Sequence, residues 1–82
     1  MIYNLFLIDE VSLAINSTGK YKAKILRFFH ELKNNPFLES HIQEKDTFGN
    51  IFDVYIIGKY AIYYCVDHAQ KEIKVLDIIC AD

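Results

Sequence analysis

The chain has 82 residues, of which 52% are hydrophobic and 24% are charged, and its formal net charge is −2. One domain, residues 1–82, is expected, near the lower limit at which a single hydrophobic core stabilises a fold without help. The slightly negative charge argues against a general attraction to nucleic acid. No apolar run approaches the roughly 20 residues that span a bilayer, and the N-terminus lacks the features of a signal peptide, so a cytoplasmic protein without a membrane partner is expected.

The first half of the chain predicts a strand and then a short helix. Ile2–Ile8 is nearly all apolar or β-favouring and forms the expected strand. Asp9 or Ser12 offers an N-cap for the helix, which Asn16–Gly19 interrupts with four poor helix formers. The apolar residues of this short helix are Val11, Ala14 and Ile15.

A second, longer helix is predicted from the spacing of its apolar residues. Ser17 or Thr18 can cap it, and it ends near Asn34 because a residue before Pro36 is displaced from the α region. The sequence leaves open whether the interruption separates two helices or kinks one. The apolar positions fall at i, i+4, i+7, i+8 and i+11, one stripe of an amphipathic helix, and are Tyr21, Ile25, Phe28, Phe29 and Leu32.

The second half predicts four strands. His41–Phe48 is expected to begin the sheet and to turn at Gly49-Asn50. Three runs rich in Ile, Val, Tyr and Phe follow, separated by Gly58-Lys59 and Asp67–Lys71, and they are Ile51–Ile57, Tyr60–Val66 and Ile73–Cys80. The expected order is β-α-α-β-β-β-β. This is an α+β fold in which a helical hairpin packs on one face of a mostly antiparallel, twisted sheet of about four or five strands.

The middle strand is apolar on both of its faces, with Ile62, Tyr64 and Val66 on one side and Ala61, Tyr63 and Cys65 on the other. An antiparallel sheet with one face in water should instead alternate apolar and polar residues. Since the helices cover one face only, the other face is expected to meet a protein partner, a second copy of the chain or the chain's own loops. The residues predicted to meet a partner there are Tyr55, Ile57, Ala61, Tyr63 and Cys65.

The two cysteines, Cys65 and Cys80, are predicted to be buried free thiols. With a turn at Asp67–Lys71, Cys65 lies opposite about Lys74 and Cys80 opposite about Lys59, too far apart along the ladder for a disulfide. The three histidines show no metal-ligand spacing. No metal and no cofactor are therefore expected.

Short motifs occur in order from the end of the second helix to the end of the chain. They are Leu32, Asn35 and Pro36 at the helix end, Gly49 in a turn, Tyr60 and Tyr64 in the middle strand, Val66-Asp67, Val75-Leu76 and the closing Asp82. With these motifs the chain resembles the RelE/ParE superfamily of small bacterial toxins. The resemblance implies a toxin of a type II toxin–antitoxin pair, with two helices on a twisted sheet. It also implies a cognate antitoxin protein that wraps the toxin and covers exposed apolar surface.

The resemblance is weakest where the nucleases of this superfamily carry their basic residues. Ribosome-dependent members use Arg and Lys to stabilise the charge that develops at the scissile phosphate. The corresponding positions here are Ala61, Ala81 and Asp53, so a conventional nuclease is not expected. The remaining candidates for catalysis are Lys59, Tyr60 and Lys45, with His41 and His68 also near the sheet; a turn lysine and an edge aromatic are commoner roles for such residues.

Lys20, Lys24 and Arg27 lie at i, i+4 and i+7 of the second helix and are candidates for contacts with nucleic-acid phosphates. The commoner role of such a stripe is the solvated side of a helix. Three functions remain: a toxin-like component that acts by binding, for example on gyrase; a ribosome-dependent mRNA interferase with an atypical active site; and a degenerate toxin-fold interaction module. A homo-oligomer through the uncovered sheet face is the alternative to an antitoxin partner.

Overall fold

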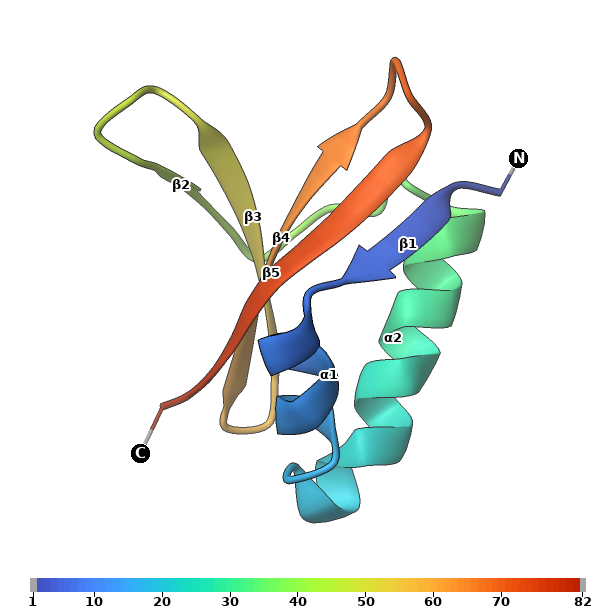
Figure 1. Ribbon diagram of the computed structural model, residues 1–82, viewed down its shortest axis with the longest axis vertical. Coiled ribbons are helices and arrows are strands. Elements are labelled where there is room, and N and C mark those ends of the chain that lie inside the picture. The colour runs from blue at the N-terminus through green and yellow to red at the C-terminus, as the bar shows by residue number, and fades with distance from the viewer. Residues whose placement is uncertain (1, 82) are drawn as a thin grey trace.

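The computed structural model describes residues 2–81, and its elements follow the predicted order (Figure 1). The strands form a five-stranded sheet, and two α-helices and a short 3-10 helix lie between the first strand and the second. The predicted α+β fold is confirmed. The elements are β1 (Asn4–Leu7), α1 (Asp9–Ile15), η1 (Gly19–Tyr21), α2 (Lys22–Asn34), β2 (Ile42–Lys45), β3 (Ile51–Ile57), β4 (Tyr60–Asp67) and β5 (Glu72–Cys80).

The sheet has the strand order β1-β5-β4-β3-β2. Strands β2 to β5 form an antiparallel meander, whereas β1 pairs in parallel with β5, Leu5 lying opposite Ile73. A parallel pair needs a long crossover connection, and here the crossover runs through both helices and the meander. Figure 1 shows α1 and α2 on the same side of the sheet.

The two helices are separate elements. α1 ends at Ile15, and η1 begins at Gly19, whose φ of 58° lies in the left-handed region that glycine tolerates. The expected side-chain caps are wrong: the N-cap of α1 is Ile8, so Asp9 is already helical, and neither helix has a side-chain cap bond. Instead, the Thr18 hydroxyl donates a 2.7 Å hydrogen bond to the Ile15 carbonyl and stabilises the turn between the helices.

The core lies between the helices and one face of the sheet. The predicted apolar stripe of α2 is buried there, apart from Tyr21 at the margin, and it meets side chains from β1, β4 and β5. Burial of apolar surface is the main stabilising term in so small a domain. The residues that are 0% exposed are Ile25, Leu32, Ile62, Ile73 and Val75.

The register of the sheet corrects two expectations about the cysteines. Cys65 lies opposite Lys74 as predicted, but Cys80 lies opposite Tyr60, because a bulge shifts the β4–β5 register between Tyr63 and Tyr64. Both thiols are free, but only Cys65 is half-buried; Cys80 is exposed near the end of β5. Burial raises the pKa of the Cys65 thiol, which keeps it protonated and unreactive near neutral pH.

Strand β2 is shorter than the predicted His41–Phe48. Asp46 stops it, because its Oδ1 accepts hydrogen bonds from the backbone N–H groups of Phe48 and Asn50, both 2.9 Å long. The Asn50 side chain also donates to Oδ2 at 3.0 Å. The hydrogen bond from this side chain is the main cause that lowers the pKa of Asp46, so the turn is held by an ionised carboxylate at neutral pH.

Candidate functional site

The sheet face opposite the helices carries exposed apolar side chains. Register places Ala61, Tyr63 and Cys65 on this face, so their predicted position is correct. Around them lie Phe6, Ile42, Ile56 and Ile79, which are 48%, 49%, 40% and 45% exposed. We call this surface the uncovered face. Asp77 and Lys74 lie opposite Tyr63 and Cys65 on it, and its exposed apolar side chains mark it as a candidate interaction surface.

Tyr55 and Ile57 do not belong to the uncovered face, and this part of the prediction is wrong. The two-residue turn at Gly58-Lys59 reverses the odd–even order between the strands, so Tyr55 lies opposite Ile62 and Ile57 opposite Tyr60. Both side chains therefore point toward the helices. Tyr55 stacks on Phe28 of α2, and Ile57 is 9% exposed within the core.

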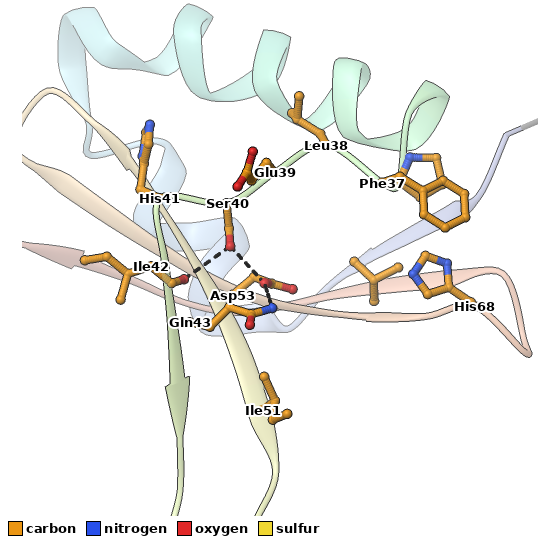
Figure 2. Close-up of a pocket in the computed structure, with 12 residues that line it drawn as sticks. Phe37, Leu38, Glu39, Ser40, His41, Ile42, Gln43, Ile51, Asp53 and His68 are labelled. Atoms are coloured by element: carbon orange, nitrogen blue, oxygen red, sulfur yellow. Dashed lines mark hydrogen bonds between the residues drawn. The ribbon is translucent and has the colours of Figure 1, made fainter.

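A hollow of about 770 Å³ opens on the helix side of the sheet. It lies between the segment 36–41, which follows α2, and strands β2 and β3, and we call it the loop hollow (Figure 2). Its apolar wall includes Phe37, Ile51 and Val66. Its polar groups come from Glu39, Ser40, His41, Gln43, Asp53 and His68.

Asp53 is the centre of the polar groups in the loop hollow. Its Oδ1 accepts two hydrogen bonds, one from Ser40 Oγ at 2.9 Å and one from Gln43 Nε2 at 3.0 Å. Figure 2 shows both bonds and shows the second carboxylate oxygen directed to the space between Ser40 and His68. Within residues 2–81, no group donates to that second oxygen, Oδ2. The carboxylate is thus fixed in place with one oxygen available to a ligand.

Three aromatic contacts hold the two walls of the loop hollow. On one side the rings of Phe28, Tyr55 and His41 form a column, with centroid distances of 4.1 and 4.2 Å, and His41 Nδ1 accepts the Ile56 N–H at 2.8 Å. On the other side His68 stacks on Phe37 at 4.5 Å. The segment 36–41 is therefore attached to the sheet at both of its ends.

Tyr64 lies beneath this region and is only 1% exposed. Its hydroxyl has no hydrogen-bond partner within the described part of the chain. Burial is the first cause that raises the pKa of Tyr64, and the negative charge of Asp53, its neighbour across the strands, is the second. A buried hydroxyl without a partner costs about 1–3 kcal/mol.

Tyr64→Phe is therefore expected to stabilise the protein by about 1 kcal/mol at neutral pH. The difference in free energy of unfolding between Tyr64→Phe and wild type should increase above pH 10, by up to about 1.4 kcal/mol per pH unit. The reason is that unfolded wild type then loses the Tyr64 proton while the folded protein retains it. Urea unfolding of both proteins from pH 7 to pH 11 measures this difference. Tyr63→Phe, at a half-buried site, is the control, and parallel pH profiles for wild type and Tyr64→Phe would contradict the assignment.

The fold matches that of solved toxin–antitoxin proteins. A chain of the archaeal RelE–RelB complex from Pyrococcus horikoshii OT3 matches with a TM-score of 0.83 and 24% identity, over 99% of this chain and 97% of that one. The RelBE2 toxin–antitoxin complex of Mycobacterium tuberculosis gives a TM-score of 0.73 and 13% identity, over 98% and 99%. The chain has a RelE-like fold. No protein-family model and no curated protein sequence matches it.

The three candidates for catalysis are only partly brought together in this RelE-like fold. Lys45 lies opposite Ile51 at the start of β3, whereas Lys59 follows the other end of that strand. Seven residues of strand separate them by about 20 Å. Tyr60 packs edge-on against Tyr21 with a centroid distance of 5.6 Å. Lys59 Nζ lies 5.9 Å from the centre of the neighbouring Tyr60 ring, so these two side chains lie together, whereas Lys45 is distant from both.

The basic stripe predicted on α2 is partly assembled. Lys24 and Arg27 line a second hollow, of about 280 Å³, beside Gly58 at the turn between β3 and β4; we call it the Gly58 hollow. Lys20 is not in its lining, and its Nζ lies 5.5 Å from the centre of the Tyr21 ring.

Neither a metal site nor a membrane-spanning helix is found within residues 2–81. No group of three or more His, Cys, Asp or Glu side chains is arranged to hold a metal ion there. No helix in that range is long and apolar enough to cross a membrane.

The centre of the loop hollow is not apparent from the sequence. There Asp53 stands out only as a position without a cation, and Ser40 and Gln43 belong to no recognisable motif. Their contacts with Asp53 join residues 13 and 10 positions apart through the path of a loop and an edge strand. No spacing rule for helices or strands connects them.

Proposed function

We propose that the chain is a toxin-like component of a type II toxin–antitoxin pair, which acts in the cytoplasm by binding its target and is neutralised by an antitoxin protein. The observation that carries this proposal is its RelE-like fold, shared over nearly the whole chain with proteins solved in toxin–antitoxin complexes. The uncovered face supports it, because an exposed apolar surface of this kind suits a protein partner. Ala61, Tyr63 and Cys65 are the predicted contacts there.

Binding is favoured over RNA cleavage by the positions of the cations. Phosphoryl transfer needs positive groups preorganised around one phosphate. The dispersed Lys45 and Lys59 do not supply such a site, and Asp53 places a negative charge in the larger hollow. We therefore propose that the chain acts by binding a macromolecular target.

An mRNA interferase with an atypical site is the second candidate, and one observation favours it. Lys24 and Arg27 together line the Gly58 hollow, where an RNA phosphate would meet two cations beside the carboxylate of Glu31. Cleavage of mRNA on programmed ribosomes by the purified protein, lost in a Lys24→Ala, Arg27→Ala double variant, would replace the binding proposal by this one.

The proposal predicts a small reading frame for the antitoxin beside the gene. Expression of the chain alone in a bacterial host is expected to arrest growth, and co-expression with the product of that predicted reading frame is expected to restore it. Co-purification of the two proteins as a stable complex measures the interaction directly. Ala61→Asp places a charge in the uncovered face between two apolar cross-strand neighbours, Ile56 and Ile79, and is expected to weaken the complex at least about tenfold, because a charge buried at an interface without a partner costs several kcal/mol.

Lys22→Glu, on the exposed surface of α2, is the control for a change of charge outside the proposed interface. Normal growth on expression of the chain alone, together with a stable complex, would show that the chain is an interaction module without toxicity. Absence of any complex, with the chain purified as a homo-oligomer instead, would overturn the antitoxin proposal and assign the uncovered face to self-association.

A further inference from the structure

We propose that the loop hollow binds a basic, amphipathic peptide segment of the antitoxin, with an arginine side chain placed against Asp53 and Glu39. This inference rests on the proposed function, since it names the chemistry of the partner and a second place where the partner is held. It concerns the helix side of the sheet, away from the uncovered face.

Charge is the first argument for a basic occupant. Apart from its two histidines, the ionisable side chains that line the loop hollow within residues 2–81 are Glu39 and Asp53, and no lysine or arginine is among them. An RNA phosphate or an acidic peptide is therefore repelled from this hollow. A cationic side chain is attracted to it, and the attraction is stronger than at an open surface because Asp53 is half-buried.

The geometry of Asp53 is the second argument. Ser40 and Gln43 both donate to Oδ1, so the carboxylate is already oriented and Oδ2 remains to accept a hydrogen bond from a ligand. A ligand that meets a group held in position by its neighbours loses little additional conformational entropy on the protein side. Glu39, on the segment that closes the hollow, adds a second carboxylate for the remaining donors of a guanidinium group.

The apolar wall is the third argument and explains why the occupant is an amphipathic segment instead of a free cation. Phe37 and Ile51 line the hollow and are 70% and 58% exposed, and Val66 adds to the same wall. Leucine-like side chains on either side of the arginine can cover them. The exposed ring of Phe37, stacked on His68, also offers a flat surface on which a guanidinium group can lie.

The test uses the full chain and two fluorescein-labelled synthetic helical peptides, one of leucine and arginine and one in which glutamate replaces every arginine. Fluorescence polarisation at low salt is expected to show binding of the arginine peptide only. Asp53→Asn is expected to weaken this binding about fivefold, and the Asp53→Asn, Glu39→Gln double variant about tenfold. The amide oxygen that Asp53→Asn introduces can still accept the bonds from Ser40 and Gln43, so the fold is retained; an unchanged melting temperature checks this.

Glu10→Gln removes the same charge from the exposed start of α1 and is the matched control, expected to change the affinity less than about twofold. Amide shifts in a ¹H–¹⁵N spectrum should change at Phe37–Gln43 and Asp53. Equal binding of the two peptides, equal loss in Glu10→Gln and Asp53→Asn, or shifts confined to Ala61 and Tyr63 would overturn the inference. Each of these results is independent of whether a complex forms with the predicted antitoxin, and the formation of that complex decides the proposed function.

Discussion

Replacing Gly58 by alanine is expected to lower the free energy of unfolding by about 3 kcal/mol, the sum of a conformational and a steric cost. Gly58 has a φ of 57°, in the left-handed region that an L-residue with a Cβ rarely adopts. A Cβ at this position would also overlap the ring of Tyr21. That ring in turn packs against Tyr60, so relaxing the overlap would disturb the join between the helices and the β3–β4 turn.

Gly19→Ala separates the two costs. Gly19 has nearly the same φ, 58°, but nothing lies within 4 Å of the position of its Cβ. Its replacement is therefore expected to cost only the conformational part, about 1–2 kcal/mol. Urea unfolding of the two variants measures the difference directly. Equal losses would show that the Tyr21 ring makes no close contact with the turn.

The elements with strong local patterns were predictable from the sequence. The stripe of α2 is visible because Ile25, Phe28 and Leu32 recur at helical spacing, and all three are buried. Strands β3 to β5 follow from their β-branched and aromatic residues and from the short turns between them. These features depend on residues close together in the chain, where local preference and tertiary structure agree.

The assignment of side chains to faces needed information that local patterns do not contain. Tyr55 and Ala61 are both odd-numbered, yet they point to opposite faces because the two-residue turn pairs odd positions with even ones. The bulge between Tyr63 and Tyr64 shifts the β4–β5 register by one residue, so that Cys80 lies opposite Tyr60 and not Lys59. Register is set by turn length and bulges, and an error of one residue transfers a side chain to the other face.

The candidate site was the least predictable part. The loop hollow exists because the segment after α2 crosses above β2 and β3, and because His41 and His68 attach that segment at its two ends. The parallel pairing of β1 with β5 is equally non-local, joining Leu5 to Ile73. Such contacts form between residues whose proximity follows from the completed fold, which the pattern of any one segment does not encode.

Phe28→Ala is expected to cost about 4 kcal/mol, the largest effect among the variants considered for this chain, because it opens a cavity in the core and removes aromatic contacts. Phe28 is 4% exposed, stacks on Tyr55 at 4.1 Å and meets the Tyr64 ring edge-on at 5.7 Å. A domain of this size has a total stability of roughly 4–12 kcal/mol, so the variant should be marginally folded or unfolded at 37 °C. Its urea midpoint and thermal midpoint measure the loss.

Phe37→Ala is the control for removing a phenyl ring. Phe37 is 70% exposed and contacts the ring of His68, so its replacement is expected to cost less than about 1 kcal/mol. Phe28→Leu, which retains most of the buried volume, should recover more than half of the loss in free energy of unfolding but not the stack on Tyr55.

Since Tyr55 also stacks on His41, Phe28→Leu is expected to loosen the segment 36–41 while the core remains folded. Faster amide hydrogen exchange in that segment, with unchanged exchange in β4 and β5, would show that the core and the loop hollow are joined through this aromatic column. Uniform exchange across the sheet and the segment would instead show that the column contributes only to global stability.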